Sequence, residues 1–318
     1  MENSKLNCLE LFSGIGGLRL GFKDYIENCT SFDMNEHANV VYTQNFNSTP
    51  NNTSISYLKE KDITGFDIWL MSPNCQPFTI RGNMEDEKDT RTEPFLHVIQ
   101  LLSMVKSPPQ YLFLENVPQF YNSNTYNLFK KVLLKQHYTI QPVIMCPSEL
   151  GIPNTRKRCF LFAHLSEPKE LPLLSFPIDP FRVKYTLKDY LGDSPNGELV
   201  PIELFKKFPN FIHDIVTIDC YKTSTFTKSY GSKNILRNGS FIGSICTLEH
   251  KDQYDLDKVI HSKARFLSVD QLLILFGFPK DFKMDNVTQK QKYALIGNSV
   301  NVNVISCLAN HFLGHQSK

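Results

Sequence analysis

The sequence predicts an α/β protein, with a doubly wound, mainly parallel sheet and a second, smaller unit rich in loops. Through residue 165, short apolar runs alternate with segments of helical length, which is typical of βαβ units. The stretch EPKELPLLSFPIDPF at 167–181 then holds four prolines and ends that alternation, as a linker or irregular segment does. Helical patterning returns only near the C-terminal end, at 268–278 and 300–313.

The expected strands are short apolar runs, six in number before the proline-rich stretch. They are Cys8 to Phe12, Thr30 to Asp33, Phe66 to Met71, Tyr111 to Leu114, Val143 to Cys146 and Cys159 to His164. Helices are predicted between them over 17–27, 35–45, 93–105 and 122–136. We therefore expect two domains, one formed by residues 1–165 plus 263–318 and a smaller one formed by residues 166–262.

The bulk composition is that of an ordinary globular enzyme, with 41% hydrophobic and 21% charged residues in 318. No run approaches the roughly 20 apolar residues that cross a bilayer, and the N-terminus does not resemble a secretory signal. The lack of such a run predicts no membrane association. Eight cysteines are scattered without a CxxC pair, which predicts reduced thiols in the cytoplasm or nucleus and no metal site. The net charge of +2 means that any nucleic acid must be bound by a local positive patch.

A glycine-rich turn follows the first strand directly, in SGIGGL at 13–18. Glycines placed after a strand and before a helix let the backbone approach a ligand closely. Asp33 ends the next strand and is well placed to hold ribose hydroxyls, while Asp62 and Ile63 precede the third strand and can touch an adenine edge and face. The alternatives are a turn needed only for packing, or a nicotinamide cofactor, because glycines do not choose between cofactors.

Cys75 lies in the loop PNCQPF that follows the third strand. Pro73 and Pro77 stiffen this loop by fixing φ, and the carboxyl end of a parallel strand is where open α/β sheets bind ligands. A lone cysteine is more often an inert buried thiol. The prolines around Cys75 favour a chemical role instead.

Polar residues also stand at the ends of two further predicted strands. Glu115 and Asn116 come at the end of QYLFLENV, and neighbouring strands lie about 5 Å apart, so Glu115 can face the same cleft as Cys75. Arg156 and Arg158 stand two residues apart at the start of another strand, on one face by strand periodicity. We expect them to contact a phosphate, a base edge or Glu115, the alternative being a solvated basic edge.

Two segments suggest contact with a substrate. Residues 79–93 are charged and follow Cys75, which predicts a mobile lid or, alternatively, a plain solvated loop. Residues 221–242 mix cations with aromatic rings, a combination that suits single-stranded nucleic acid but also occurs in loops over buried aromatics. The residues are Lys222, Lys228, Lys233, Arg237, Tyr221, Phe226, Tyr230 and Phe241.

Five motifs together resemble the cytosine carbon-5 methyltransferases over residues 8 to about 310. They are Phe12-Ser13-Gly14-x-Gly16-Gly17, Pro73-x-Cys75-Gln76, Glu115-Asn116-Val117, Arg156-x-Arg158 and Gly297-Asn298-Ser299-Val300. Further segments are most similar to the small eukaryotic branch related to DNA methyltransferase 2, whose activity is methylation of cytosine 38 in the anticodon loop of aspartate tRNA. They are MSPNCQPFTIRGN, FTKSYG at 226–231, RFLSVDQLLILFGFP at 265–279 and LIGNSVNVNVIS at 295–306.

The resemblance implies a Rossmann-like fold that binds S-adenosylmethionine, with residues 166–262 as a target-recognition domain. It implies a catalytic set of Cys75, Glu115, Arg156 and Arg158, and substrate contacts by Gln76, Lys222, Lys228 and Tyr230. The implied cofactor set is Phe12, Ser13, Gly14, Ile15, Gly16, Gly17, Asp33, Met34, Asp62, Ile63, Pro73, Asn298 and Ser299. Since Asn298 and Ser299 precede the last helix, the C-terminal segment is expected to pack back onto the N-terminal domain.

The chain departs from the family pattern in three places. Asn74 stands where the family has a second proline, and Thr225-Phe226-Thr227 replaces the branch's usual Cys-Phe-Thr. RNGSFIGS at 237–244 replaces a Gly-Thr-Gly-Ser loop. The last two departures lie in the predicted target-recognition domain.

The chemistry implied is covalent. The Cys75 thiolate adds to carbon 6 of cytosine, Glu115 supports protonation at nitrogen 3, and carbon 5 takes a methyl group from S-adenosylmethionine, which leaves as S-adenosylhomocysteine. The expected partner is tRNA, with aspartate tRNA foremost. The alternatives are DNA cytosine methylation, which fits the same pocket chemistry, and a catalytically silent nucleic-acid binder.

Overall fold

The computed structural model describes residues 5–78, 86–165, 184–192, 196–232, 236–247 and 255–314. The chain forms two compact units. The first holds residues 1–145, 157–175 and 305–318, and the second holds residues 146–156 and 176–304. Residues 263–304 thus group with the second unit, whereas the sequence assigned them to the first domain, and that domain assignment stays a prediction.

The first unit is built on a six-stranded sheet with the order β2-β1-β3-β4-β6-β5. β1, β2, β3 and β4 pair in parallel, and β6 pairs antiparallel with both β4 and β5, so the predicted mainly parallel sheet is confirmed. The strands are β1 (Leu6–Leu11), β2 (Ile26–Phe32), β3 (Ile68–Met71), β4 (Tyr111–Asn116), β5 (Tyr138–Met145) and β6 (Arg158–Leu165).

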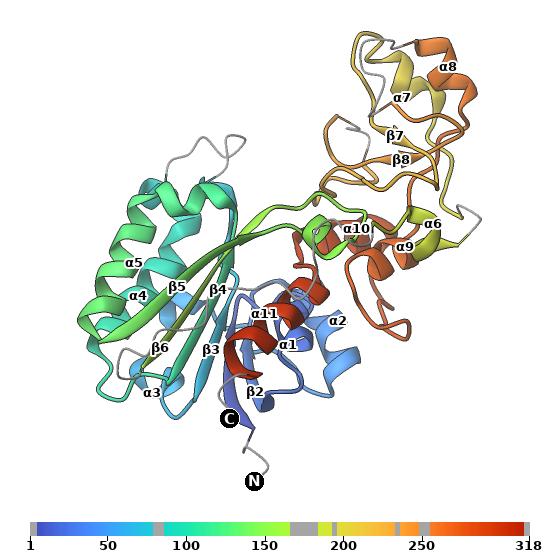
Figure 1. Ribbon diagram of the computed structural model, residues 1–318. Coiled ribbons are helices and arrows are strands. Elements are labelled where there is room, and N and C mark those ends of the chain that lie inside the picture. Colours follow the sequence, from blue (N-terminus) through green and yellow to red (C-terminus); the bar gives the residue numbers. More distant parts are fainter. Residues whose placement is uncertain are drawn as a thin grey trace. The chain divides into compact units, whose positions relative to one another are not determined.

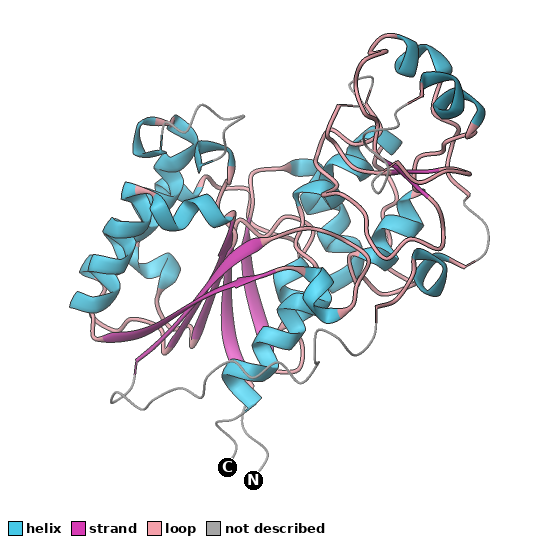
Figure 2. Cartoon of the chain, turned by 45° about the horizontal axis from the view of Figure 1, so that its top comes forward, coloured by secondary structure: helices cyan, strands magenta, loops and turns pink. Residues whose placement is uncertain are grey.

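Helices cover both faces of this sheet (Figures 1 and 2). Side chains alternate along β4: Leu112 and Leu114 join the buried cluster that includes Phe95 and Phe129, while Phe113 packs edge-on to Phe22 on the other face. The helices of this unit are α1 (Gly17–Gly21), α2 (Glu36–Phe46), α3 (Glu60–Ile63), α4 (Glu93–Met104), α5 (Asn124–Lys135) and most of α11 (Val302–Gly314).

Most of the C-terminal helix belongs to this first unit. From Ile305 onward the chain groups with the N-terminal sheet, and Phe312 stacks on Phe162 of β6 with ring centroids 4.3 Å apart. Gly21 of α1 allows close packing here, because a Cβ at Gly21 would lie 2.2 Å from Ile305 Cγ2.

Two of the longer helices, α2 and α5, begin at side-chain caps. The Asn35 side chain accepts hydrogen bonds from the amides of His37 and Ala38 at the start of α2, and Ser123 accepts one from the Tyr126 amide at the start of α5. The predicted helix over 17–27 is wrong in length: α1 ends at Gly21, because β2 begins at Ile26 and pairs there with Leu6 of β1.

The second unit is rich in loops, as predicted, and its core is aromatic. Tyr230 packs edge-on to Phe226, Phe266 and Tyr293, with ring centroids 4.9 to 5.5 Å apart. Its elements are α6 (Leu187–Leu191), α7 (Ile202–Lys206), β7 (Ile215–Val216), β8 (Phe241–Ile242), α8 (Leu256–His261), α9 (Val269–Leu275) and α10 (Gln289–Asn298). The sequence analysis did not predict α10, whose capping box joins Thr288 and Gln291.

Candidate active site

The glycine turn connects β1 to α1 with an unusual backbone. Phe12 has φ 59° and Gly14 has φ 53°, both in the left-handed region. Gly16 has φ 81°, and a Cβ there would lie 2.2 Å from the Phe46 ring of α2. The turn can therefore take this shape only with glycine at position 16. Ile15 is buried, and Gly17 begins α1.

Asp33 follows β2 and lies against this turn. One carboxylate oxygen accepts a hydrogen bond from the Gly14 amide (2.7 Å), and the other accepts one from the Asn35 amide (2.8 Å). Burial raises the pKa of Asp33, and these two amide bonds oppose that rise. Each oxygen keeps a further lone pair, so the carboxylate can still accept the ribose hydroxyls predicted for it.

Two features show that the turn fits a polar ligand. The Ser13 hydroxyl is buried and has no hydrogen-bond partner among the described residues. A Cβ at Gly14 would meet no atom within 4 Å, so space is open beside the backbone. A buried unpaired hydroxyl, open space and a carboxylate suit the amino-acid and ribose groups of S-adenosylmethionine.

The other cofactor candidates of the first unit have varied surroundings. Asp62 accepts a hydrogen bond from the Lys59 amide (2.8 Å) and so caps α3, while Ile63 is 2% exposed and belongs to the core. Met34 is 62% exposed directly after Asp33. Ile63 therefore packs in the hydrophobic core, a role that its position in the sequence did not reveal.

The Cys75 loop is fixed to the sheet at its base. Asn116, at the end of β4, donates a hydrogen bond from Nδ2 to the Pro73 carbonyl (3.0 Å), and its Oδ1 accepts from the Val117 amide. Cys75 then opens a short 3-10 helix, Gln76–Phe78, in which its carbonyl accepts from the Phe78 amide (3.1 Å). Cys75 forms no disulfide and is half-buried, at the border of the hydrophobic cluster of the first unit.

Glu115 lies at the base of the same loop. β3 and β4 pair with Met71 opposite Leu114, which brings Ser72 next to Glu115. The Ser72 hydroxyl donates a hydrogen bond to one carboxylate oxygen (2.8 Å), and Arg158 Nε forms an ion pair with the other (3.1 Å). Of the three contacts predicted for the arginine pair, the structure thus shows the one between Arg158 and Glu115.

Cys159, near the same site, has the properties of an inert buried thiol. Cys159 of β6 is fully buried and its sulfur lies 3.0 Å from the Val117 carbonyl. Burial, together with the nearby Glu115 charge, raises the pKa of Cys159 well above that of a free thiol. Cys159 is therefore a structural cysteine, in contrast to the accessible Cys75.

Arg156 differs from Arg158 in a way that the sequence did not reveal. β6 begins at Arg158, so the expectation that both arginines share one strand face is wrong. Arg156 belongs to the second unit, where its guanidinium donates to the carbonyls of Phe226 (3.0 Å), Gly297 (3.1 Å) and Ser299 (2.6 Å). Three carbonyl contacts and 3% exposure describe a residue that holds the GNSV segment in place.

Asn298 and Ser299 also belong to the second unit. Asn298 is the exposed last residue of α10, and Ser299 caps the helix through its amide, which donates to the Ile296 carbonyl (2.9 Å). Gly297 is required by close packing, because a Cβ there would lie 2.3 Å from the Thr227 backbone. Contact of Asn298 and Ser299 with the cofactor stays a prediction.

The substrate candidates divide by exposure. Lys222 and Lys228 are exposed, and Gln76 accepts a hydrogen bond from the Arg91 guanidinium. Tyr230 is 2% exposed, and its hydroxyl donates to the Ser240 carbonyl (2.9 Å) and accepts from the Leu267 amide (2.8 Å). This burial contradicts the prediction that Tyr230 binds substrate: the ring is part of the aromatic core. Phe226 and Phe241 are buried likewise, whereas Tyr221 is exposed.

The predicted lid is described only from Asp86 onward, and residues 79–85 lie outside the described residues. The Asp86 carboxylate accepts hydrogen bonds from the Asn124 amide (2.6 Å) and from the Thr125 hydroxyl (2.6 Å) at the start of α5. Arg91 pairs with Asp89 and reaches Gln76, next to Cys75. Neither Ser72 nor Arg91 was singled out from the sequence. The signal for Ser72 was a polar residue directly after an apolar strand, and Arg91 lies within the charged segment 79–93 predicted as a lid.

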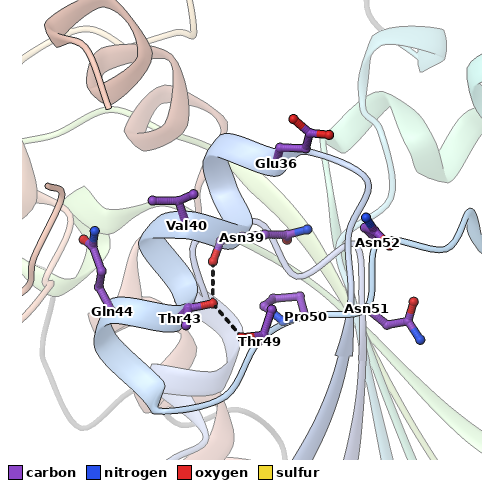
Figure 3. A pocket seen from close by; sticks show the side chains of 9 residues that line it. All are labelled: Glu36, Asn39, Val40, Thr43, Gln44, Thr49, Pro50, Asn51 and Asn52. Atoms are coloured by element: carbon purple, nitrogen blue, oxygen red, sulfur yellow. Dashed lines mark hydrogen bonds between the residues drawn. The ribbon is translucent and has the colours of Figure 1, made fainter. Parts of the chain in front are cut away.

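A groove of about 640 Å³ lies between α2 and the Thr49–Asn52 segment (Figure 3). No predicted catalytic or cofactor residue lines it. Two lining residues hold the Asp33 backbone, since Asn39 Nδ2 donates to the Asp33 carbonyl (2.8 Å) and the Asn51 carbonyl accepts from the Asp33 amide (3.1 Å). Residues that line the groove thus help to fix the backbone of Asp33.

The described residues show neither a membrane-spanning helix nor a cluster of metal ligands. No helix among them is long and apolar enough to span a membrane. No three His, Cys, Asp or Glu side chains in the described part of the chain gather as a metal site would require.

Comparison with known proteins supports the chemistry that this geometry suggests. The family described as C-5 cytosine-specific DNA methylase matches residues 6–313. A tRNA (cytosine(38)-C(5))-methyltransferase of Spodoptera frugiperda is 33% identical over 94% of this chain and 96% of its own length. A DNA (cytosine-5)-methyltransferase of Dictyostelium discoideum is 31% identical over 95% of this chain and 93% of its own.

A solved structure agrees with these relatives. The crystal structure of the S. pombe Dnmt2 methyltransferase has a TM-score of 0.86 and 28% identity, and the match covers 99% of this chain and 100% of that one. The fold, the motifs and the relatives lead to one conclusion. The chain is a cytosine C5-methyltransferase, a member of the C-5 cytosine-specific methylase family that is similar to Dnmt2 and the tRNA (cytosine(38)-C(5))-methyltransferases.

Proposed function

We propose that this protein methylates carbon 5 of cytosine 38 in the anticodon loop of aspartate tRNA, through a transient bond between Cys75 and the base. The observation that carries the proposal is the arrangement at the ends of β3 and β4, where the accessible Cys75 follows a loop held by Asn116 and Glu115 is oriented by Ser72 and Arg158. S-adenosylmethionine is the proposed methyl donor, and when bound it supplies the methyl group that carbon 5 receives.

The residues of this chain make carbon 5 reactive. The Cys75 thiolate donates an electron pair to carbon 6, so a sulfur–carbon bond forms and the 5,6 double bond opens toward carbon 5. Glu115 accepts a hydrogen bond from the exocyclic amino group and holds a proton at nitrogen 3, which takes up the charge that the addition places on the ring. After methylation, a base removes the proton from carbon 5, the double bond forms again and the sulfur leaves.

Orientation of Glu115 is the task of two residues. Ser72 holds one carboxylate oxygen and Arg158 the other, so the carboxylate cannot rotate freely about its bond. Each oxygen retains a lone pair for the base. The turn Ser13–Gly17 with Asp33 is proposed to hold the cofactor, through the unpaired Ser13 hydroxyl, the space beside Gly14 and the Asp33 carboxylate.

An RNA loop is the substrate that costs least to bind. A base must leave its stack to reach a thiol at the bottom of a loop, and this costs a few kcal/mol in a duplex but less in single strands. The Spodoptera relative, whose name specifies cytosine 38 of tRNA, supports the same choice. Lys222 and Lys228 are exposed and available to phosphates.

The family description and the Dictyostelium relative both name DNA and favour a second candidate, methylation of DNA cytosine. Transfer of tritiated methyl groups from labelled cofactor to purified aspartate tRNA and to duplex DNA separates the two. We expect label in tRNA, and bisulfite sequencing should place it at cytosine 38. Label in DNA alone would overturn the RNA assignment.

The covalent step is tested by Cys75→Ala, with Cys159→Ala as a matched control at a structural thiol. Cys75→Ala should abolish turnover and still bind the cofactor, whereas Cys159→Ala should keep turnover once its stability is accounted for. Trapping with tRNA that carries 5-fluorocytosine at position 38 should give a protein–RNA adduct stable to denaturation. An adduct formed by Cys75→Ala would refute Cys75 as the nucleophile.

A further inference from the structure

A fully buried carboxyl group lies behind the glycine turn, and the proposed mechanism does not use it. Glu10 of β1 is 0% exposed, and its side chain points to the face of the sheet that carries α1 and α2. One carboxylate oxygen accepts a hydrogen bond from the Arg19 amide in α1 (3.2 Å). The other accepts one from the Tyr42 hydroxyl in α2 (2.7 Å). Glu10 therefore joins three elements around the turn.

Arg19 and Tyr42 complete a directional chain of hydrogen bonds. Arg19 Nη1 donates to the Tyr42 hydroxyl (3.1 Å), which in turn donates to Glu10. The Arg19 guanidinium also lies over the Phe46 ring, 4.7 Å from its centroid. The two Arg19 contacts join α1 to α2. Because the turn ends where α1 begins, they also fix the end of the turn relative to α2.

The turn itself touches this cluster. The hypothetical Cβ of Gly16 lies 2.2 Å from the Phe46 ring and 3.1 Å from the Tyr42 ring, so the Gly16 backbone rests on the same two aromatic side chains. A shift of Tyr42 or Phe46 would therefore change the path of residues 13–17. Ser13, Gly14 and the Asp33 contact, which the proposed function gives to the cofactor, lie within that path.

We propose that Glu10 is a positioning residue for cofactor binding: by accepting from the Arg19 amide and the Tyr42 hydroxyl, it holds the turn Ser13–Gly17 in the shape that binds S-adenosylmethionine. The inference rests on the proposed function in one respect, that this turn is the cofactor site. Glu10 does not touch the cofactor in this account. It acts through Arg19, Tyr42 and the aromatic wall of α2.

Ionised Glu10 accepts with both oxygens, whereas protonation turns one oxygen into a donor and weakens it as an acceptor. Burial raises the pKa of Glu10 to about 7, and the bonds from Tyr42 and Arg19 oppose that rise. The other titratable or charged groups facing Glu10 are Cys29 of β2, with Sγ 3.9 Å away, and Asp33, while Cys8 lies on the same strand. Cofactor affinity should therefore weaken as the pH falls through about 7.

Isothermal titration calorimetry with S-adenosylmethionine tests this on the full chain without RNA. Tyr42→Phe removes the hydroxyl and keeps the ring, and it should raise Kd by about tenfold, the effect of one hydrogen bond to a charged group. Tyr138→Phe is the matched control, since it removes a buried tyrosine hydroxyl bonded to the Pro109 carbonyl elsewhere in the same unit. Its Kd should stay within about twofold of the wild-type value.

Glu10→Gln tests the pH dependence of cofactor affinity, which a merely structural role of Glu10 would not change. Between pH 6 and pH 8 the wild-type Kd should fall as the pH rises, and the Glu10→Gln Kd should stay flat. In turnover assays, both variants should raise KM for the cofactor more than they lower kcat. Should Glu10→Gln not fold, Tyr42→Phe still decides the matter.

Three outcomes are distinct. Wild-type Kd values for Tyr42→Phe and Glu10→Gln would overturn the positioning role while leaving the proposed function intact. Equal losses in Tyr42→Phe and Tyr138→Phe would overturn it as well, because general destabilisation would then explain both. Failure of the wild-type protein to bind S-adenosylmethionine would refute the proposed cofactor itself.

Discussion

Glu115 and Arg158 show how single residues set the chemistry of this site. The Arg158 ion pair and the Ser72 hydroxyl hold the two oxygens of one carboxylate, so the orientation of Glu115 depends on both neighbours. A catalytic group held by its neighbours loses activity when either neighbour is removed. Arg158 is thus more than a basic residue at the edge of the sheet.

Substitution of Arg158 should slow catalysis without preventing cofactor binding. We expect Arg158→Ala to lower kcat by about 10–100-fold, because a misoriented carboxylate supports the base less well. Lys157→Ala, at the exposed neighbouring position, should stay near the wild-type rate. Single-turnover methylation of tRNA measures both, and equal rates for Arg158→Ala and wild type would remove the orienting role.

Glu10 also makes stability depend on pH. Its pKa is about 7 in the folded protein against 4.5 for the free group, so between these pH values the folded state holds a proton that the unfolded state has released. The contribution is complete below pH 4.5 and is lost as the pH rises through 7. Over that window the free energy of unfolding should fall by about 3 kcal/mol more in wild type than in Glu10→Gln. Urea unfolding at several pH values measures the difference, and parallel curves would contradict it.

At the scale of elements, the turn between β1 and α1 depends on the contact with α2. Gly16 has a positive φ and no room for a Cβ, whereas Gly65 has φ 84° and no atom within 4 Å of its hypothetical Cβ. Substitution at Gly65 would introduce backbone strain alone. Substitution at Gly16 would add a steric clash between the new Cβ and the Phe46 ring.

Alanine at these two glycines should have unequal effects. Gly65→Ala should cost about 1–2 kcal/mol for the left-handed backbone alone. Gly16→Ala should cost about 1–3 kcal/mol more, because the Phe46 ring must move, and it should weaken cofactor binding. Chemical denaturation and calorimetry test both variants. Equal destabilisation with unchanged cofactor affinity would show that α2 does not shape the turn.

The loops after β3 and β4 are another case of mutual support between elements. Asn116 ends one strand and holds the Pro73 carbonyl of the loop that follows its neighbour. The sequence placed both segments at carboxyl ends of parallel strands, and this alone brought Cys75 and Glu115 to one edge of the sheet. The hydrogen bond itself joins residues 43 positions apart. It could not be predicted without knowing that β3 and β4 are neighbours in the sheet.

At the scale of the whole molecule, the C-terminal helix completes the N-terminal sheet. Phe312 of α11 is 1% exposed and stacks on Phe162 of β6, so the last helix adds apolar burial to strands formed much earlier in the chain. The core of the first unit is therefore built from segments far apart in the chain.

Removal of the Phe312 ring should destabilise that unit. Phe312→Ala should lower the free energy of unfolding by about 3–5 kcal/mol, the usual cost of a large cavity in a core. Asn310→Ala, on the same helix and exposed, should change it by less than about 1 kcal/mol. Urea denaturation compares the two, and equal values would mean that α11 is not a structural part of the sheet's core.

The sequence by itself determined the alternation of strands and helices, the mainly parallel sheet and the chemical candidates Cys75, Glu115 and Arg158. These follow from local signals, namely apolar periodicity, glycines or polar residues at strand ends, and short motifs. The tertiary structure decided the rest: that Tyr230 is core, that Arg156 holds a backbone segment of the second unit, that Ser72 bonds Glu115, and that Tyr42 bonds the buried Glu10. Burial and hydrogen-bond partners join residues far apart in the chain, and only the packed fold brings such residues together.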